Sequence, residues 1–153
     1  MRRAFALISL AIVAGAADAA PPVTPMSPAE AVAAAAVLPD GAIGVFQFVV
    51  KSLGDDEEDN APGEAEDPVY LNSDGNHRVA TNLSVMIMPA AARDLANILG
   101  GPLGARLLGK RVSITGTARQ QKIDLLDARN RPTGKAYLQT RIIVNDADQI
   151  KVR

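Results

Sequence analysis

The chain has 153 residues, a formal net charge of −1, no cysteine, a single histidine and only 3% aromatic residues. Without cysteine it can form no disulfide, thiol nucleophile or cysteine-bound metal site. The few aromatic rings leave little material for surfaces that stack on nucleic-acid bases or sugars.

The first 19 residues have the pattern of a cleavable secretory signal peptide. Arg2 and Arg3 precede an apolar run, residues 4–17, that carries no charge, and Ala17 and Ala19 are small residues at the positions a signal peptidase recognises. A membrane anchor is the alternative, but a span needs about 20 apolar residues and this run ends at Asp18. We therefore expect a bacterial periplasmic or secreted protein.

Residues 20–41 form a Pro/Ala-rich lead with a short helix. Ser27, Pro28 and Glu30 make a capping-box pattern that starts the helix near residue 28, and Pro39 ends it. The segment 43–52 alternates between two largely apolar faces, which predicts a central strand.

An acidic loop is predicted for residues 54–67. The loop contains four weak candidates for the ligands of a bound cation, and their carboxylate oxygens suit Ca²⁺: Asp55, Asp56, Glu57 and Asp59. The spacing fits no EF-hand loop, so a solvated loop is the favoured interpretation. A brief strand, residues 68–72, then leads through an Asp-Gly turn to a return strand over 79–88. His77 follows this turn and is expected to be exposed.

Pro89 opens an amphipathic helix that ends at Gly100. A strand follows over residues 110–119, in which Gly116 suggests a bulge or a sharp coil of the sheet, and residues 123–126 extend it. After a loop with several arginines comes the last long strand, residues 136–144, with Ile150 and Val152 as a final edge contact.

Three strands, a helix and two further strands are the element order of an OB-fold, a five-stranded Greek-key barrel with its helix between strands 3 and 4. The residues that carry a closer likeness are Val69-Tyr70-Leu71-Asn72, Asn82-Leu83-Ser84-Val85, the run 108–117, and Asp146-Ala147-Asp148-Gln149-Ile150. Over residues 42–153 the chain resembles the small bacterial OB-fold domains grouped with nucleic-acid-binding proteins. The resemblance implies a mainly β fold and transfers no catalytic residue.

The chemistry of the sequence favours a binding protein over an enzyme. There is one histidine, and Gly100-Gly101-Pro102-Leu103-Gly104 lacks the Gly-Lys-Ser/Thr ending of a phosphate loop, so neither catalysis nor a cofactor is expected. We expect a monomeric or weakly associating binding module of the cell envelope that recognises a protein, peptide or small charged ligand.

Charge divides the chain and leaves a second hypothesis open. Residues 20–74 hold 11 acidic residues and one lysine, a net −10, whereas residues 75–153 hold 13 basic and five acidic residues, a net +8. The halves can face separate partners or attract each other. Single-stranded nucleic acid is the alternative ligand, bound by the basic region around the last two strands, although the acidic loop would repel phosphates. The candidate ligand-binding residues are Tyr70, Arg78, Arg111, Arg119, Arg129, Arg131 and Tyr137.

Overall fold

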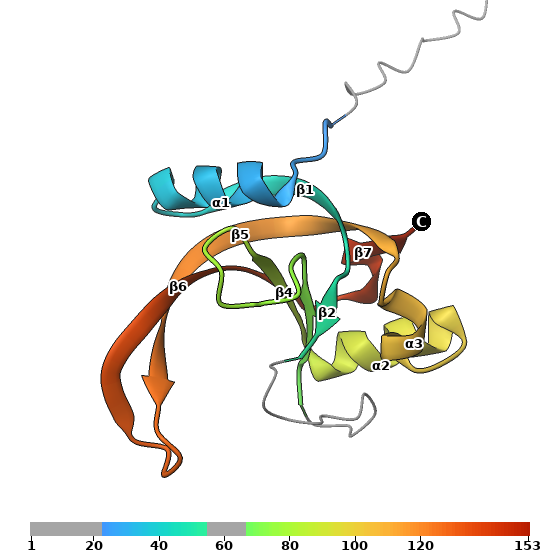
Figure 1. Ribbon diagram of the computed structural model, residues 1–153. Coiled ribbons are helices and arrows are strands. Elements are labelled where there is room, and N and C mark those ends of the chain that lie inside the picture. Colours follow the sequence, from blue (N-terminus) through green and yellow to red (C-terminus); the bar gives the residue numbers. More distant parts are fainter. Residues whose placement is uncertain (1–22, 55–66) are drawn as a thin grey trace, which may run out of the picture.

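A computed structural model describes residues 23–54 and 67–153 of the chain (Figure 1). The predicted signal peptide, residues 1–19, and the four acidic cation candidates, Asp55, Asp56, Glu57 and Asp59, lie outside the described residues. The protein is mainly β: a curled, half-barrel sheet with a few helices.

The elements follow one another in a simple order. They are α1 (Pro28–Val37), β1 (Ala42–Val49), β2 (Ser52–Leu53), β3 (Val69–Asn72), β4 (Leu83–Ile87), α2 (Pro89–Leu99), α3 (Leu103–Leu107), β5 (Arg111–Leu126), β6 (Pro132–Val144), the 3-10 turn η1 (Ala147–Gln149) and β7 (Ile150–Val152). Five strands were predicted, and the described residues contain seven. The first predicted strand is interrupted at Val50 and Lys51, which separate β1 from β2, and the predicted edge contact at residues 150–152 forms β7.

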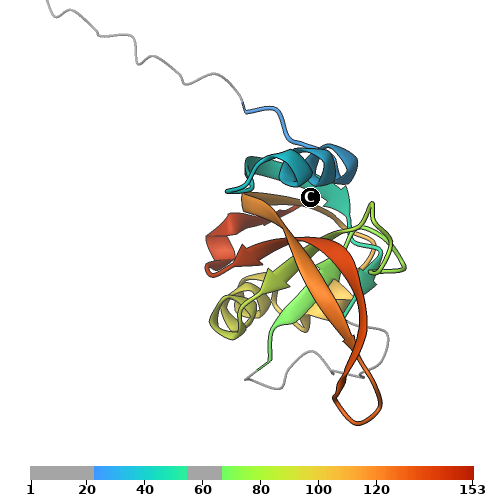
Figure 2. The same cartoon turned by 90° about the vertical axis from the view of Figure 1, so that its left-hand side faces the viewer.

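The strands form one sheet in the order β1-β5-β6-β4-β3-β2, with β7 beside β5. β4 and β6 run parallel, and the other neighbouring strands are antiparallel. Because β1 and β2 stand at the two ends of this path and only two residues separate them in the chain, the curl of the sheet brings its two ends close together (Figures 1 and 2).

A single hydrophobic core fills the curl of the sheet. Phe46 and Phe48 of β1 lie opposite Ile114 and Val112 of β5, and all four are buried. Helix α1 lies over β1 and β5, and α2 and α3 lie at the opposite end of the sheet (Figure 1). Burial of large apolar side chains on this scale is the main stabilising contribution to such a fold.

The capping box predicted for α1 is confirmed. The Ser27 backbone N–H donates to Glu30 Oε2 at 2.7 Å, and Ser27 Oγ accepts from the Glu30 backbone N–H at 3.4 Å. The Ser27 backbone donor, helped by the Ser27 hydroxyl, lowers the pKa of Glu30.

Of the two alternatives predicted at Gly116, a bulge or a sharp coil of the sheet, the bulge is wrong. Gly116 pairs in regular register with Gly44, and the irregular step lies farther along, between Asp124 and Leu126. A Cβ at residue 116 would lie 2.9 Å from Ile142 Cγ2, so close packing explains this glycine. The predicted extension of the strand through residues 123–126 is confirmed, because β5 is continuous for 16 residues.

The return strand predicted over residues 79–88 forms over a shorter range, because β4 begins only at Leu83 and ends at Ile87. Residues 73–82 instead form a broad connection between β3 and β4, here called the 73–82 connection. One backbone hydrogen bond, from the Ser73 N–H to the Leu83 carbonyl at 3.1 Å, closes the connection, and side chains add to it. Asn82 Oδ1 accepts from the Asp74 backbone N–H at 3.0 Å, and Ser73 Oγ accepts from the Leu83 backbone N–H at 2.8 Å.

Candidate ligand-binding surface

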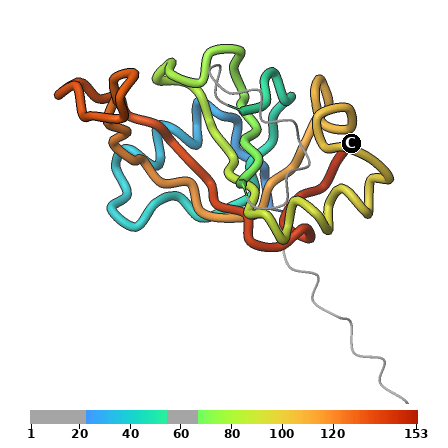
Figure 3. The backbone as a smooth tube through the Cα atoms, turned by 90° about the horizontal axis from the view of Figure 1, so that it is seen from below, coloured from blue at the N-terminus to red at the C-terminus, as the bar shows by residue number. Residues whose placement is uncertain are grey.

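The last two long strands extend beyond the body of the sheet. The pairing of β5 with β1 ends at Ala118, and β6 meets β4 only from Thr140 onward. Between these points, residues 119–139 form a two-stranded ribbon, here called the arm. It curves beside the 73–82 connection (Figures 1 and 3).

The arm has two different faces because successive side chains alternate across a strand. Gln121, Ile123, Tyr137 and Gln139 form its inner face and are partly or fully buried. The outer face is exposed and carries Gln120, Lys122, Asp124, Leu126, Ala136 and Leu138. The inner face is therefore covered in part by the rest of the molecule.

Arg141 lies where the inner face of the arm continues onto the sheet. Its guanidinium carbon is 5.3 Å from the centre of the Tyr70 ring, a cation–π contact. Its Nε and Nη2 donate to Gln139 Oε1 at 3.1 and 2.6 Å, and Nη1 contacts Met86 Sδ at 3.7 Å. Strands β3, β4 and β6 thus hold one cation in a fixed orientation above an aromatic ring.

Tyr137 and His77 bring the arm and the 73–82 connection together. Their ring centroids are 6.3 Å apart with planes at 63°, an edge-to-face contact. His77 is only 4% exposed, so the expectation of an exposed turn histidine is wrong. The physical reason is that the turn is not a tight hairpin: the connection is broad, and His77 packs under the arm.

A buried polar network fixes the 73–82 connection to β3 and β4. Asn82 Nδ2 donates to Asn72 Oδ1 at 3.2 Å, to the His77 carbonyl at 3.2 Å and to Ser84 Oγ at 3.1 Å. Ser84 Oγ in turn donates to Asn72 Oδ1 at 2.5 Å. Buried polar groups of this kind are stabilising only when each has a partner, which is the case here.

Comparison of the chain with known protein families and with curated proteins finds no match. Residues 23–54 and 67–153 bring no three His, Asp or Glu side chains together as a metal site. In the same part of the chain, none of the helices has the length and apolar character required to cross a membrane.

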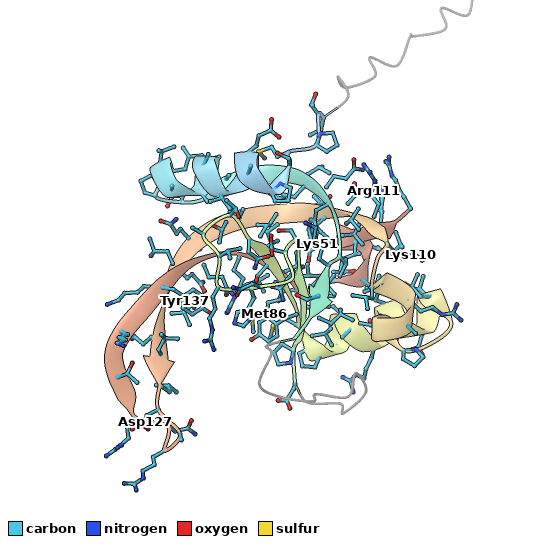
Figure 4. All side chains as sticks on the ribbon, viewed as in Figure 1. Lys51, Met86, Lys110, Arg111, Asp127 and Tyr137 are labelled. Carbon is cyan, nitrogen blue, oxygen red and sulfur yellow. The ribbon has the colours of Figure 1, made fainter. Side chains whose placement is uncertain are left out.

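The structure groups some of the predicted ligand residues and separates others. Tyr70 and Tyr137 lie on the surface around Arg141, and Arg78, which is exposed, directly follows His77 in the 73–82 connection. In Figure 4, Tyr137 lies on the arm and Met86 toward the centre of the sheet, whereas Arg111 lies at the other end of β5. Arg111 is thus remote from this group.

The remaining predicted residues lie along the arm. Arg119, at its base, donates from Nε to the Asp40 carbonyl at 3.1 Å. Arg129 and Arg131 lie in the turn at its tip, where Arg131 Nε and Nη2 donate to Asp127 Oδ2 at 2.9 and 2.7 Å. The Arg131 side chain, with the backbone N–H groups of Arg131 and Arg129, lowers the pKa of Asp127. The guanidinium of Arg131 is therefore already engaged.

Sequence reasoning left Arg141, Gln139 and Met86 out of the candidate site. The alternation of β6 could have found the first two, because residues 137, 139 and 141 share one face of that strand. Met86 required knowing that β4 lies beside β6, which is a long-range pairing.

Proposed function

We propose that the domain is an OB-fold in which β1 and β2 together form the first strand. β3, β4, β5 and β6 are then the second to fifth strands, and α2 and α3 stand between the third and fourth. The parallel pairing of β4 with β6, and the pairing of the first strand with both β3 and β5, support this assignment. In OB-folds the second and third strands and their flanking loops form the usual ligand face.

We infer that the protein is an exported, non-enzymatic binding module of the cell envelope, and that its ligand is an acidic peptide segment. The observation that carries this proposal is Arg141, oriented by Gln139 and placed over Tyr70. An arginine has five N–H donors, and contacts with described residues engage three of them. The other two can donate to a ligand carboxylate, and Tyr70 and Met86 offer apolar contact beside it.

A peptide suits this surface better than single-stranded nucleic acid. Bases bind such folds by stacking on open aromatic rings. Here Arg141 already covers one face of Tyr70, and the Tyr137 ring has His77 against it. Arg131, at the tip of the arm, is paired with Asp127. Export of the module is proposed on the signal-like pattern of residues 1–19.

Replacing Arg141 with alanine should weaken binding of a fluorescein-labelled Glu-rich peptide about tenfold or more, since one charge-assisted contact contributes about 1.5–3 kcal/mol. Fluorescence anisotropy at low salt measures this loss, with thermal melts to verify that the variant is folded. Arg111→Ala is the matched control, because it removes the same charge from the remote end of β5. It should change the affinity less than about twofold.

Three outcomes would reject the proposal. One is an equal loss of affinity in Arg141→Ala and Arg111→Ala, which would indicate attraction by net charge alone. Another is absence of peptide binding. The third is salt-dependent binding of an oligothymidylate in preference to the peptide, which would favour the nucleic-acid alternative.

A further inference from the structure

The arm leaves one strand edge open along β5. Beyond Ala118, β5 pairs only with β6 among the described residues. Asp40 and Gly41 lie beside Arg119, and the opposite edge of residues 120–126 has no strand beside it. The edge of β1 is different, because the Met26 backbone forms hydrogen bonds with the backbone of Val45 and Gln47 and covers part of that edge. An open edge presents unpaired backbone N–H and C=O groups and is a template for another strand.

The two edges of the arm are not equivalent. The β6 edge contains Pro132, which has no N–H, and Gly134, whose φ of +76° departs from extended backbone. Residues 119–126 of β5 contain neither proline nor glycine. Of the two, the β5 edge is therefore the one able to accept a partner strand.

The sequence of this edge is complementary to itself in antiparallel orientation. If Ile123 lies opposite Ile123 of a second copy, Lys122 lies opposite Asp124 of that copy, and Asp124 lies opposite its Lys122. Shifting the axis by one residue places Lys122 opposite Lys122 or Asp124 opposite Asp124. Directly opposed charges of opposite sign stabilise a strand pair and like charges destabilise it, which favours the Ile123 register.

The ion pair within one copy does not prevent this exchange. Lys122 Nζ and Asp124 Oδ1 are 3.8 Å apart in the same strand, with side chains 71% and 66% exposed. An ion pair so exposed to solvent contributes little to stability. Both side chains can therefore form ion pairs with a second copy instead.

Exposed apolar side chains lie where the same pairing would cover them. In the Ile123 register, Leu126 lies opposite Gln120 of the other copy, and Gln120 lines a pocket that also includes Val37 and Leu38. Leu126, Val37 and Leu38 are 53%, 76% and 47% exposed in the single chain. Contact of Leu126 of one copy with Val37 and Leu38 of the other would bury apolar side chains that are exposed to water in a monomer.

We propose that two copies of this chain associate through the β5 edges of their arms, antiparallel and centred on Ile123. The two arms then form one four-stranded sheet about a two-fold axis, and Leu126 of each copy packs at the Val37–Leu38 pocket of the other. Of the two states expected from the sequence, monomeric or weakly associating, this selects the second. It does not depend on the proposed peptide ligand.

Charge-reversal variants, expressed as full chains, test the pairing by sedimentation over a range from about 1 µM to about 1 mM. The unmodified protein should shift toward twice the monomer mass as concentration rises. Lys122→Asp alone and Asp124→Lys alone should each weaken the association about tenfold or more, because each opposes like charges twice. An equimolar mixture of the two variants should associate about as strongly as the unmodified protein. The mixture is decisive, because neither variant retains the ion pair within its own chain.

A single cysteine tests the register. Ile123→Cys should form a disulfide-linked dimer on mild oxidation, since directly opposed residues lie about 4.5–5.5 Å apart between Cα atoms. The chain has no other cysteine, so the product is unambiguous. Lys135→Cys, on the other strand of the arm, is the control and should form no disulfide-linked dimer under the same conditions. A monomer at every concentration, no association in the mixture, or equal cross-linking of both cysteine variants would overturn the proposal.

Discussion

Asn82→Ala is expected to lower the free energy of unfolding by about 3 kcal/mol, because it leaves several buried hydrogen-bonding groups without a partner. Asn82 is 1% exposed and bonds the backbone of Asp74 and His77 as well as the side chains of Asn72 and Ser84. Urea unfolding followed by circular dichroism measures the change. The variant should also exchange amide hydrogens faster across the 73–82 connection than in β5.

Ser52→Ala is the matched control for this network. Ser52 Oγ donates one hydrogen bond, to the Asp74 carbonyl at 2.8 Å. Ser52 is not among the residues that bond to the Asn82 side chain. Its loss should cost about 1 kcal/mol. Equal destabilisation by the two variants would contradict this expectation, because Asn82 would then contribute no more than a single polar contact.

Gly41→Ala is expected to cost about 3 kcal/mol, because two independent penalties act at this position. Gly41 has a φ of +84°, a conformation that side-chain-bearing residues rarely adopt. A Cβ there would also lie 2.6 Å from the Ala118 carbonyl oxygen, a backbone atom that cannot turn away. The glycine allows the chain leaving α1 to pass against β5 at the base of the arm.

Gly109→Ala separates the two penalties. Gly109 has a φ of +74°, but a Cβ there would meet nothing within 4 Å. Its substitution should therefore cost only the conformational part, about 1 kcal/mol. If thermal unfolding gave the same shift for both variants, close approach of Gly41 to β5 would not be the reason for its glycine.

Much of the fold follows from local patterns. The Ser27 and Glu30 capping box predicted where α1 begins, and apolar alternation predicted β1, β4 and β5, because these signals depend on residues close in sequence. The shape of the 73–82 connection could not be predicted from such local patterns. Its shape depends on Asn82 reaching back to Asn72 and Asp74. Taken along the strand alone, Asn82 and Ser84 look like polar positions on an exposed face.

The candidate site was predictable only in part, for a similar reason. Tyr70 and Tyr137 were identified because they are rare aromatic residues in this sequence. The basic residues could not be ranked, because charge alone does not show that Arg111 lies at the far end of β5 while Arg141 lies over Tyr70. That distinction depends on the parallel pairing of β4 with β6, which brings residues far apart in the chain together.

Chemical-shift mapping tests most directly whether ligand binds on the surface between the arm and the β3–β4 pair. Titrating the Glu-rich peptide into ¹⁵N-labelled protein should perturb the amide signals of Tyr70, Met86 and Tyr137, and the side-chain Nε–H signal of Arg141. The signals of Arg111 and Lys151 should stay unchanged. Perturbations confined to Arg129 and Arg131 at the tip of the arm, or spread evenly over all basic residues, would contradict the account.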